Sequence, residues 1–272
     1  MKSFYINLDN AIARRKSIED SFARHNNRGW TLERVQGVDT DYVRNSKVPG
    51  TLRDEEKACF LSHLNLIVQN ADADEHIFVL EDDACFAQLT FETIDGLLPL
   101  PASFGDWDLL FTDVGIASVG TMAELVRLRR QLQPKNQIKL LDLKFLPFFA
   151  ATAYIVNKSS LRKLSRLMTV EQLDVPFDLL LRKMVYDGVL KAFVAFPFLT
   201  SVSEHSSNSS QQPKSTEKTD WIFNLFRRMI WIDGDSFDPA PLLDQVCQSI
   251  GERSHAYGRL WAAMIDPGFR PK

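Results

Sequence analysis

The stretch Ile77-Phe78-Val79-Leu80-Glu81-Asp82-Asp83 is the clearest structural signal in the chain. Its four apolar residues, with polar residues on both sides, are typical of a parallel strand that is buried on both faces. The strand stops at three consecutive acids. Because ligands of open α/β sheets bind beyond the carboxyl ends of the strands, this stretch predicts both the fold class and the place of a site.

Strand and helix patterns alternate on both sides of this stretch. Further predicted strands cover residues 3–9, 32–35, 109–112, 151–156 and 193–196. Predicted helices cover residues 14–24, 54–70, 160–168 and 177–186. Such alternation is typical of an α/β fold in which helices flank a mostly parallel sheet. We therefore expect residues 1–200 to form one α/β domain around the strand at residues 77–80.

The chain changes character after residue 200. Residues 201–219 are rich in serine and have no apolar periodicity, so we expect a polar loop there. Residues 220–272 are expected to form a C-terminal helical extension, which begins with the aromatic and basic segment 221–231. Two interpretations of that segment stay open. It is either a helix that packs its aromatic side chains on the domain, or an amphipathic helix that brings Arg227 and Arg228 to anionic lipids of the inner membrane.

Composition narrows the class of protein. The 272 residues are 45% hydrophobic and 25% charged, which excludes a disordered chain and a coiled coil. A net charge of -3 gives no overall basic field, so we expect no nucleic-acid partner. The three cysteines form no CxxC pair, and the chain has no run of about 18 apolar residues that would span a bilayer. These features predict a cytoplasmic protein in a reducing compartment.

The three acids have the chemistry of a cation site. Side chains alternate along a strand, so Glu81 and Asp83 are expected to point the same way and Asp82 the opposite way. Two converging carboxylates repel each other unless a proton or a cation lies between them. A hard divalent ion, Mn²⁺ or Mg²⁺, that is also bound by a diphosphate removes this repulsion. A solvated acidic turn is the alternative.

The predicted helix at residues 54–70 carries a second group of reactive side chains. Glu56, Cys59 and His63 are spaced by three and four residues and therefore share one face. A zinc site is one interpretation, but three ligands on one short helix cannot close a tetrahedral cage alone. We favour Glu56 and His63 at a substrate cleft, with Cys59 packed as a small hydrophobic residue.

Several short motifs occur together along the first 200 residues. They are Tyr5–Asp9 followed by Arg14, Val38-Asp39, Glu56–His63, Val79–Asp83 and Val175–Asp178. In their order and spacing they resemble glycosyltransferase family 25, which includes bacterial lipooligosaccharide galactosyltransferases and collagen hydroxylysine galactosyltransferases. The segment Glu56–His63 is similar to the family's E-x-(G/A)-C-x-x-S-H helix, and Val79–Asp83 is similar to its LEDD element. After residue 210 the chain has no counterpart in the family.

The resemblance implies a GT-A type fold and an enzyme that transfers a hexose with inversion. The implied donor is a UDP-sugar, UDP-galactose above all. The implied acceptor is a glycan or lipid-linked glycan such as lipooligosaccharide, lipopolysaccharide or capsule. A divalent Mn²⁺ or Mg²⁺ ion would act as a Lewis acid toward the leaving diphosphate. Such an enzyme would work in the cytoplasm or at the inner face of the membrane.

The motif residues take their expected roles from this resemblance. Asp83 is the first choice for a metal ligand, together with Glu81 and His205. Asp178, two residues after a proline at the start of a predicted helix, is the expected general base, and a first-turn helix residue is the alternative. Asp113 is a further candidate for contact with a sugar. The expected donor-binding residues are Asn7, Leu8, Arg14, Asp39, Glu56, His63, Glu81 and Asp82.

Two other functions stay open at this point. The same carboxylates suit a metal-dependent nucleotidyl or phosphoryl transferase, although the sequence has no Walker loop to hold phosphates. A module of the same fold that binds a nucleotide or a glycan without catalysis is the other alternative.

Overall fold

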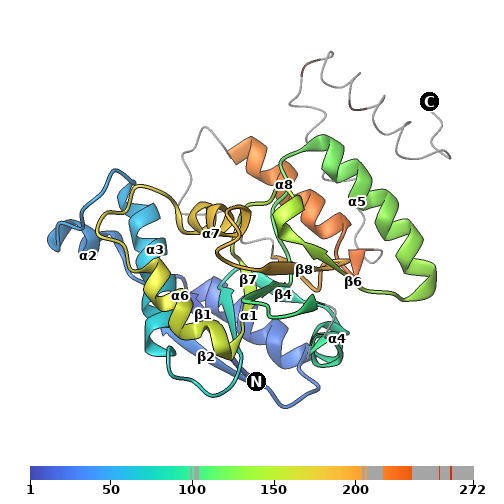
Figure 1. The fold of residues 1–272 in the computed structure, drawn as a ribbon, viewed down its shortest axis with the longest axis horizontal. Helices are drawn as coiled ribbons and strands as arrows, with labels where there is room; N and C mark the ends of the chain where they lie inside the picture. Colours follow the sequence, from blue (N-terminus) through green and yellow to red (C-terminus); the bar gives the residue numbers. More distant parts are fainter. Residues whose placement is uncertain are drawn as a thin grey trace.

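A seven-stranded sheet forms the centre of the molecule, in the order β2-β1-β3-β7-β5-β8-β6 (Figure 1). The computed structural model describes residues 1–98, 104–203 and 217–234, with the single residues 100, 206, 251 and 258. The strands of the large sheet are β1 (Lys2–Asn7), β2 (Thr31–Gln36), β3 (Ile77–Glu81), β5 (Leu109–Phe111), β6 (Lys139–Asp142), β7 (Ala153–Val156) and β8 (Ala192–Phe196). A separate two-stranded sheet pairs β4 (Ala84–Phe86) with β9 (Thr200–Val202).

The large sheet is mostly parallel, which confirms the prediction from the alternating pattern. β1, β2 and β3 run in one direction, and β5 and β8 run in the same direction. β7 lies between β3 and β5 and is antiparallel to both, and β6 is antiparallel to β8. The amino end of β7 therefore meets the carboxyl end of β3 at the edge of the sheet where the acids lie.

Helices cover both faces of this sheet. The α-helices are α1 (Ile12–His25), α2 (Thr40–Asn45), α3 (Asp54–Gln69), α4 (Thr90–Leu97), α5 (Val119–Leu132), α6 (Leu161–Met168), α7 (Phe177–Tyr186) and α8 (Glu217–Met229). Short 3₁₀ turns occur at Gln133–Lys135, Leu143–Phe145 and Lys158–Ser160. One buried cluster contains side chains of α3, α6 and α7, and a second contains side chains of α1 and α4.

β3 belongs to both buried clusters, as its unbroken apolar run predicts. Ile77 and Val79 pack in the first cluster, whereas Phe78 and Leu80 pack in the second. Because successive side chains of a strand point to opposite faces, a strand covered on both sides needs apolar residues at every position. The strand reaches the surface only where the acids begin.

The elements that the sequence patterns do not predict are α2, α4, α5, β4, β6 and β9. Of these, α2 has six residues and β4 and β9 have three each, which is too short for a periodic pattern. β6 lies at the edge of the sheet and is partly exposed, so its sequence mixes polar and apolar residues. α4 and α5 are longer, and neither is among the helices expected from the sequence.

The segment expected as a polar loop has regular structure at both ends. Its first two residues belong to β9, and its last three belong to α8. β9 is polar in sequence yet buried, because it pairs with β4 and because the hydroxyls of Thr200 and Thr112 share a hydrogen bond of 2.7 Å. The Ser203 N–H donates to the carbonyl of Asp83 at 2.7 Å. The residue that follows β9 therefore helps to hold the turn that carries the acids.

α8 packs onto the domain. Phe226 and Ile230 belong to the first buried cluster. Arg227 is 5% exposed, and its guanidinium forms an ion pair with the fully buried Asp113, with Nε and Oδ2 3.0 Å apart. For the described side chains the packed-helix interpretation is therefore right, and the placement of Arg227 at lipid headgroups is wrong. The expectation that Asp113 contacts a sugar is also wrong, because the side chain is fully buried and its Oδ2 pairs with Arg227.

Among the described residues, no helix combines the length and the apolar character that crossing a membrane requires.

Breaking the Asp113–Arg227 pair should destabilise the fold strongly. Asp113→Asn removes the counter-charge and leaves the Arg227 guanidinium buried, which should lower the free energy of unfolding by about 3–5 kcal/mol. The matched control is Asp72→Asn, because Asp72 pairs with Arg162 at 2.6 Å while the two side chains are 78% and 71% exposed. That loss should stay below about 1 kcal/mol. Urea unfolding of both variants measures the difference, and equal losses would contradict this account.

Candidate active site

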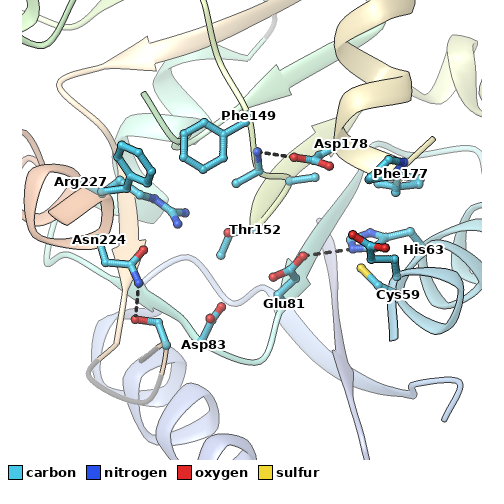
Figure 2. Close-up of a pocket in the computed structure, with 16 residues that line it drawn as sticks. Cys59, His63, Glu81, Asp83, Phe149, Thr152, Phe177, Asp178, Asn224 and Arg227 are labelled. Atoms are coloured by element: carbon cyan, nitrogen blue, oxygen red, sulfur yellow. Dashed lines mark hydrogen bonds and ion pairs between the residues drawn. The ribbon is translucent and has the colours of Figure 1, made fainter. Parts of the chain in front are cut away.

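Two adjoining cavities open at the edge of the sheet where β1 and β3 end. We call them the Asp178 cavity and the Asn7 cavity. The residues around the Asp178 cavity include Glu56, Cys59, His63, Glu81, Asp83, Phe149, Thr152, Asp178, Asn224 and Arg227 (Figure 2). The residues around the Asn7 cavity include Asn7, Leu8, Arg14, Asp39, Cys59, His63, Glu81 and Asp82. Cys59, His63 and Glu81 line both.

Every predicted site residue that the structure describes, apart from the buried Asp113, lines one of these cavities. The expected base Asp178 and the expected metal ligand Asp83 share the Asp178 cavity. The expected donor-binding residues at the end of β1 and on α1 line the Asn7 cavity. His205 lies outside the described residues. The structure thus brings the predicted side chains together, and their chemical roles stay predictions.

The acidic stretch divides its side chains between the two cavities. Glu81 is the last residue of β3, and its backbone N–H donates to the Thr152 carbonyl at 2.8 Å. Asp83 lines the Asp178 cavity, whereas Asp82 lines the Asn7 cavity. Asp82 and Asp83 thus line different cavities, as the predicted alternation expects, whereas Glu81 lines both.

Asp82 and Asp83 share one arginine. Arg14, on α1, places Nη2 2.6 Å from Asp82 and 3.2 Å from Asp83. The Asn7 side-chain amide also donates to Asp82, at 2.7 Å. Parallel pairing of β1 with β3 puts the residues at the ends of both strands next to each other. Arg14 offsets part of the negative charge, and its buried Nε has no hydrogen-bond partner within the described structure.

Asp83 has an incomplete set of partners. Burial raises the pKa of its carboxyl to about 6; Glu81 and Asp82 add to the rise, and Arg14 opposes it. Its Oδ1 atom is buried and finds no hydrogen-bond partner in the part of the chain that the structure describes. An unpartnered carboxylate oxygen beside two further carboxylates is a place that a divalent cation would stabilise. The residues of this turn therefore fit the predicted cation.

Stacking and hydrogen bonds hold His63 in one orientation. Its ring is 1% exposed and stacks on Phe177, with centroids 4.3 Å apart and an interplanar angle of 15°. Nδ1 lies 3.0 Å from the Tyr154 hydroxyl, and Nε2 lies 3.4 Å from the Glu81 carboxylate. Burial acts to raise the pKa of Glu81, but the hydrogen bond with His63 and nearby positive charge, including Arg14 and Arg227, together lower that pKa. Glu81 is thus an ionised acid at neutral pH.

Asp178 lies in the first turn of α7 and turns its carboxylate into the cavity (Figure 2). Its Oδ2 accepts a hydrogen bond of 2.8 Å from the Ala150 N–H. Ala150 has a φ of 65°, a left-handed conformation that is rare outside glycine and that is found more often at functional sites. Burial raises the pKa of Asp178, although backbone hydrogen bonds oppose the rise. Asp178 is therefore a first-turn residue of α7, as the alternative interpretation expects, and it also lines the cavity, as a general base must.

Two predicted site residues also cap helices. Glu56 accepts a hydrogen bond of 3.1 Å from the Arg53 backbone N–H and pairs with its guanidinium at the start of α3. Asp39 is the N-cap of α2 and accepts from the Tyr42 N–H at 2.7 Å. Both side chains border a cavity, yet the caps alone account for their positions.

α8 supplies a wall of the Asp178 cavity that the sequence patterns do not predict. Arg227 and Asn224 line it, and the Asn224 amide donates to the Ser206 hydroxyl at 3.1 Å. Phe223 packs edge-on against Phe149, with ring centroids 5.2 Å apart. The aromatic and basic composition of residues 221–231 indicates a helix that binds to another surface, but it does not show where that helix docks.

A family model decides the class of enzyme. The model described as Glycosyltransferase family 25 (LPS biosynthesis protein) matches residues 1–181. The chain belongs to glycosyltransferase family 25. Among the functions that the sequence leaves open, this membership selects glycosyl transfer. The acidic stretch and Asp178 of this family 25 glycosyltransferase lie inside the matched segment, whereas β8, β9 and α8 come after it.

Solved glycosyltransferase structures are similar to this family 25 glycosyltransferase at low identity. The galactosyltransferase LgtC, in complex with donor and acceptor sugar analogs, is 13% identical over 71% of this chain and 73% of that chain, with a TM-score of 0.40. The apo form of the glycosyltransferase GlyE in Streptococcus pneumoniae TIGR4 is 10% identical over 70% of this chain and 44% of that chain, with a TM-score of 0.39. No curated protein matches the chain in sequence.

Gly115 leaves room for Phe149 in the wall of the Asp178 cavity. Their backbones exchange hydrogen bonds of 2.7 and 3.0 Å, and a Cβ at Gly115 would lie 2.5 Å from the Phe149 ring. Gly115→Ala should push the ring aside, cost about 1–3 kcal/mol of unfolding free energy and slow transfer. In the control Gly96→Ala, the new Cβ meets nothing within 4 Å, so the fold should gain up to about 1 kcal/mol. Equal stability and equal transfer rates in the two variants would refute the claim that Gly115 leaves room for the Phe149 ring.

Proposed function

We propose that this glycosyltransferase moves a hexose, galactose from UDP-galactose, onto a glycan acceptor with inversion and with a divalent cation. The proposed acceptor is a bacterial cell-surface glycan such as lipooligosaccharide, lipopolysaccharide or capsule, in keeping with the description of the family. The observation that carries the proposal is that Asp83, Glu81 and Asp178 share one cavity, beside a second cavity lined by Asn7 and Arg14. The two cavities supply adjoining places for acceptor and donor.

The Asn7 cavity suits the nucleotide part of the donor. Its volume of about 530 Å³ lies within the range of roughly 300–1,000 Å³ for small-molecule sites. Asn7 and Asp39 offer hydrogen-bonding groups to a base or a ribose, and Arg14 offers a guanidinium to phosphate. The buried Nε of Arg14, which has no partner among the described groups, supports that use. A diphosphate bound here would lie beside the acidic turn.

Asp83 and Glu81 would hold the cation. Both line the Asp178 cavity, and Asp83 offers the buried Oδ1 that lacks a partner in the described structure. Hard divalent ions prefer carboxylate oxygens, and the donor diphosphate would complete their ligand set, which favours Mn²⁺ or Mg²⁺. When bound, the ion supplies Lewis-acid stabilisation of the charge that develops on the leaving diphosphate.

Asp178 would remove the proton from the acceptor hydroxyl. Inversion requires attack from the face opposite the leaving group, with a base on the attacking side. Asp178 lines the same cavity as Asp83 but comes from α7, a different element. Burial raises the pKa of Asp178, which makes its carboxylate a stronger base, and the Ala150 N–H fixes its orientation.

Cation binding should follow the ionisation of Asp83. At pH 7.5 the carboxyl is ionised, so Mn²⁺ with UDP should raise the Tm; ligand at 100 times its Kd adds about 2.7 kcal/mol of stability. At pH 5, which is below the pKa of about 6, the ion must displace a proton, so the increase in Tm should shrink. Thermal unfolding at the two pH values measures this difference, and equal increases would count against Asp83 as a ligand.

Asp83→Asn gives a second test of the same ligand. Folding raises the pKa of Asp83 from 3.8 to about 6. Ionising this carboxyl therefore costs more in the folded chain than in the unfolded chain. The free energy of unfolding is highest below pH 3.8 and falls as the pH rises through 6. Without metal at pH 7.5, Asp83→Asn should therefore have a higher Tm than the native chain, and Mn²⁺ added to the UDP complex should not raise it further. Asp20→Asn is the control, because Asp20 is exposed and pairs with Lys16. A full Mn²⁺ response in Asp83→Asn would exclude Asp83.

A nucleotide-sugar screen tests the function itself. UDP release is measured for each donor with a lipooligosaccharide extract as acceptor, with and without Mn²⁺. The expected result is release from UDP-galactose that requires both the extract and the cation. Release from no donor under any of these conditions would overturn the proposed reaction.

Asp178→Asn should slow transfer strongly and leave donor binding intact. Loss of a general base should lower turnover by about 10²–10⁴-fold, whereas the Tm increase with Mn²⁺ and UDP should remain. Asp187→Asn is the matched control, because Asp187 lies exposed at the other end of α7 and pairs with Lys183. Full turnover in Asp178→Asn would exclude it as the base.

A further inference from the structure

A set of three metal-binding side chains lies between the two cavities. Cys59 and His63 are one turn apart on α3, and Glu81 ends β3. One ligand atom from each, a sulfur, a ring nitrogen and a carboxylate oxygen, lies within 4.8 Å of the other two. Figure 2 shows Cys59 beside His63, with Glu81 in contact with the His63 ring. The three side chains line both cavities, so the space beside them is open to solutes.

The fold removes the objection that the sequence raises against zinc. On the helix alone the third ligand would be Glu56, which instead caps α3 with Arg53. Glu81 takes that place from a strand, so the ligands approach from two elements. Three protein ligands with an open fourth position are typical of a reactive zinc site.

The chemistry of these ligands favours one class of ion. Thiolate and imidazole suit Zn²⁺, whereas Mg²⁺ and Mn²⁺ prefer sites made of oxygen atoms. The Asp83 side of the turn offers carboxylates, and the Cys59 side offers sulfur and nitrogen. Glu81 therefore lies between an oxygen site at Asp83, which suits Mn²⁺ or Mg²⁺, and a sulfur and nitrogen site at Cys59 and His63, which suits Zn²⁺.

The ring of His63 is already oriented for coordination. Phe177 stacks on it at 4.3 Å, and the Tyr154 hydroxyl lies 3.0 Å from Nδ1. Nε2 faces Glu81. A metal-bound histidine almost always has a hydrogen bond at its other ring nitrogen, which fixes the ring and its tautomer. Tyr154 supplies that partner here.

We propose that Cys59, His63 and Glu81 form a second metal site, which binds Zn²⁺ or an ion of the same class. The ion binds the thiolate, so the thiol proton of Cys59 leaves to solvent, and the fourth position faces the cavities. Glu81 also belongs to the carboxylates that would hold the catalytic cation. Zinc at this site therefore inhibits transfer, a consequence that rests on the proposed function, whereas zinc binding itself does not.

Metal titration of the full chain tests the site directly. The metal-free protein is titrated with Zn²⁺ by calorimetry and with Co²⁺ by absorbance, since cobalt bound to a thiolate has a charge-transfer band in the near ultraviolet. The native chain should bind one ion and show the band. Cys59→Ser and His63→Gln should lose the band and weaken Zn²⁺ binding by more than the roughly 10–100-fold typical of an outer-shell change. Tyr154→Phe should fall within that smaller range.

Cys85→Ser is the matched control, because Cys85 is a second cysteine without a disulfide that lies on β4. It should keep the band and the affinity for zinc. Cys59→Ala is tested as well, because the serine hydroxyl of Cys59→Ser could itself bind the metal ion. Each variant is first checked for native urea unfolding, and His63→Asn replaces His63→Gln if the latter does not fold. A Cys59→Ser or Cys59→Ala chain that binds Zn²⁺ as the native chain does, or a native chain that shows no band, would overturn the proposal.

Asp83→Asn separates this proposal from the proposed function. Because Asp83 is not one of the three ligands, the variant should bind Zn²⁺ and show the cobalt band as the native chain does. If no nucleotide-sugar is a donor but zinc still binds through Cys59, the proposed function fails and the zinc site stands. Loss of the cobalt band in Asp83→Asn would count against a separate site.

Discussion

The negative charge at the end of β3 is the constraint on which the rest of this structure depends. Three consecutive carboxylates at the end of a buried strand lose hydration and repel one another. Their partners come from elements far apart in sequence: Arg14 from α1, Asn7 from β1 and His63 from α3. The parallel pairing of β1 with β3 and the packing of α1 and α3 on opposite faces bring these groups within reach. The order of the strands therefore also decides which polar groups stabilise the three carboxylates.

This compensation is fuller on one side of the turn than on the other. Burial raises the pKa of both carboxyls. Asp82 has an amide and a guanidinium as partners, whereas Asp83 shares the same arginine and keeps, among described groups, an unpartnered oxygen. Buried polar groups in native proteins normally find partners, so those that do not are often part of a functional site. The unpartnered oxygen of Asp83 belongs to a residue that lines the Asp178 cavity.

The two halves of the Asp178 cavity come from different parts of the chain. The acids and Asp178 lie within the segment that matches the family, and Arg227 and Asn224 come from α8, beyond it. The buried pair of Arg227 with Asp113 ties α8 to the strand layer. The family segment thus supplies the reactive groups, while α8 supplies part of the cavity's shape and charge.

Local patterns of the sequence determined the elements that carry the acids, His63 and Asp178. Their signals are an unbroken apolar run for the strand, helical spacing for the helix of His63 and a proline before the helix of Asp178. Each of these signals lies within a few neighbouring residues. Tertiary structure alone decided that Glu81 joins Cys59 and His63, that β7 runs against its neighbours, and that Asp113 pairs with Arg227. Each of these contacts joins groups that are distant in sequence. Their formation depends on strand order and helix docking, which no local pattern encodes.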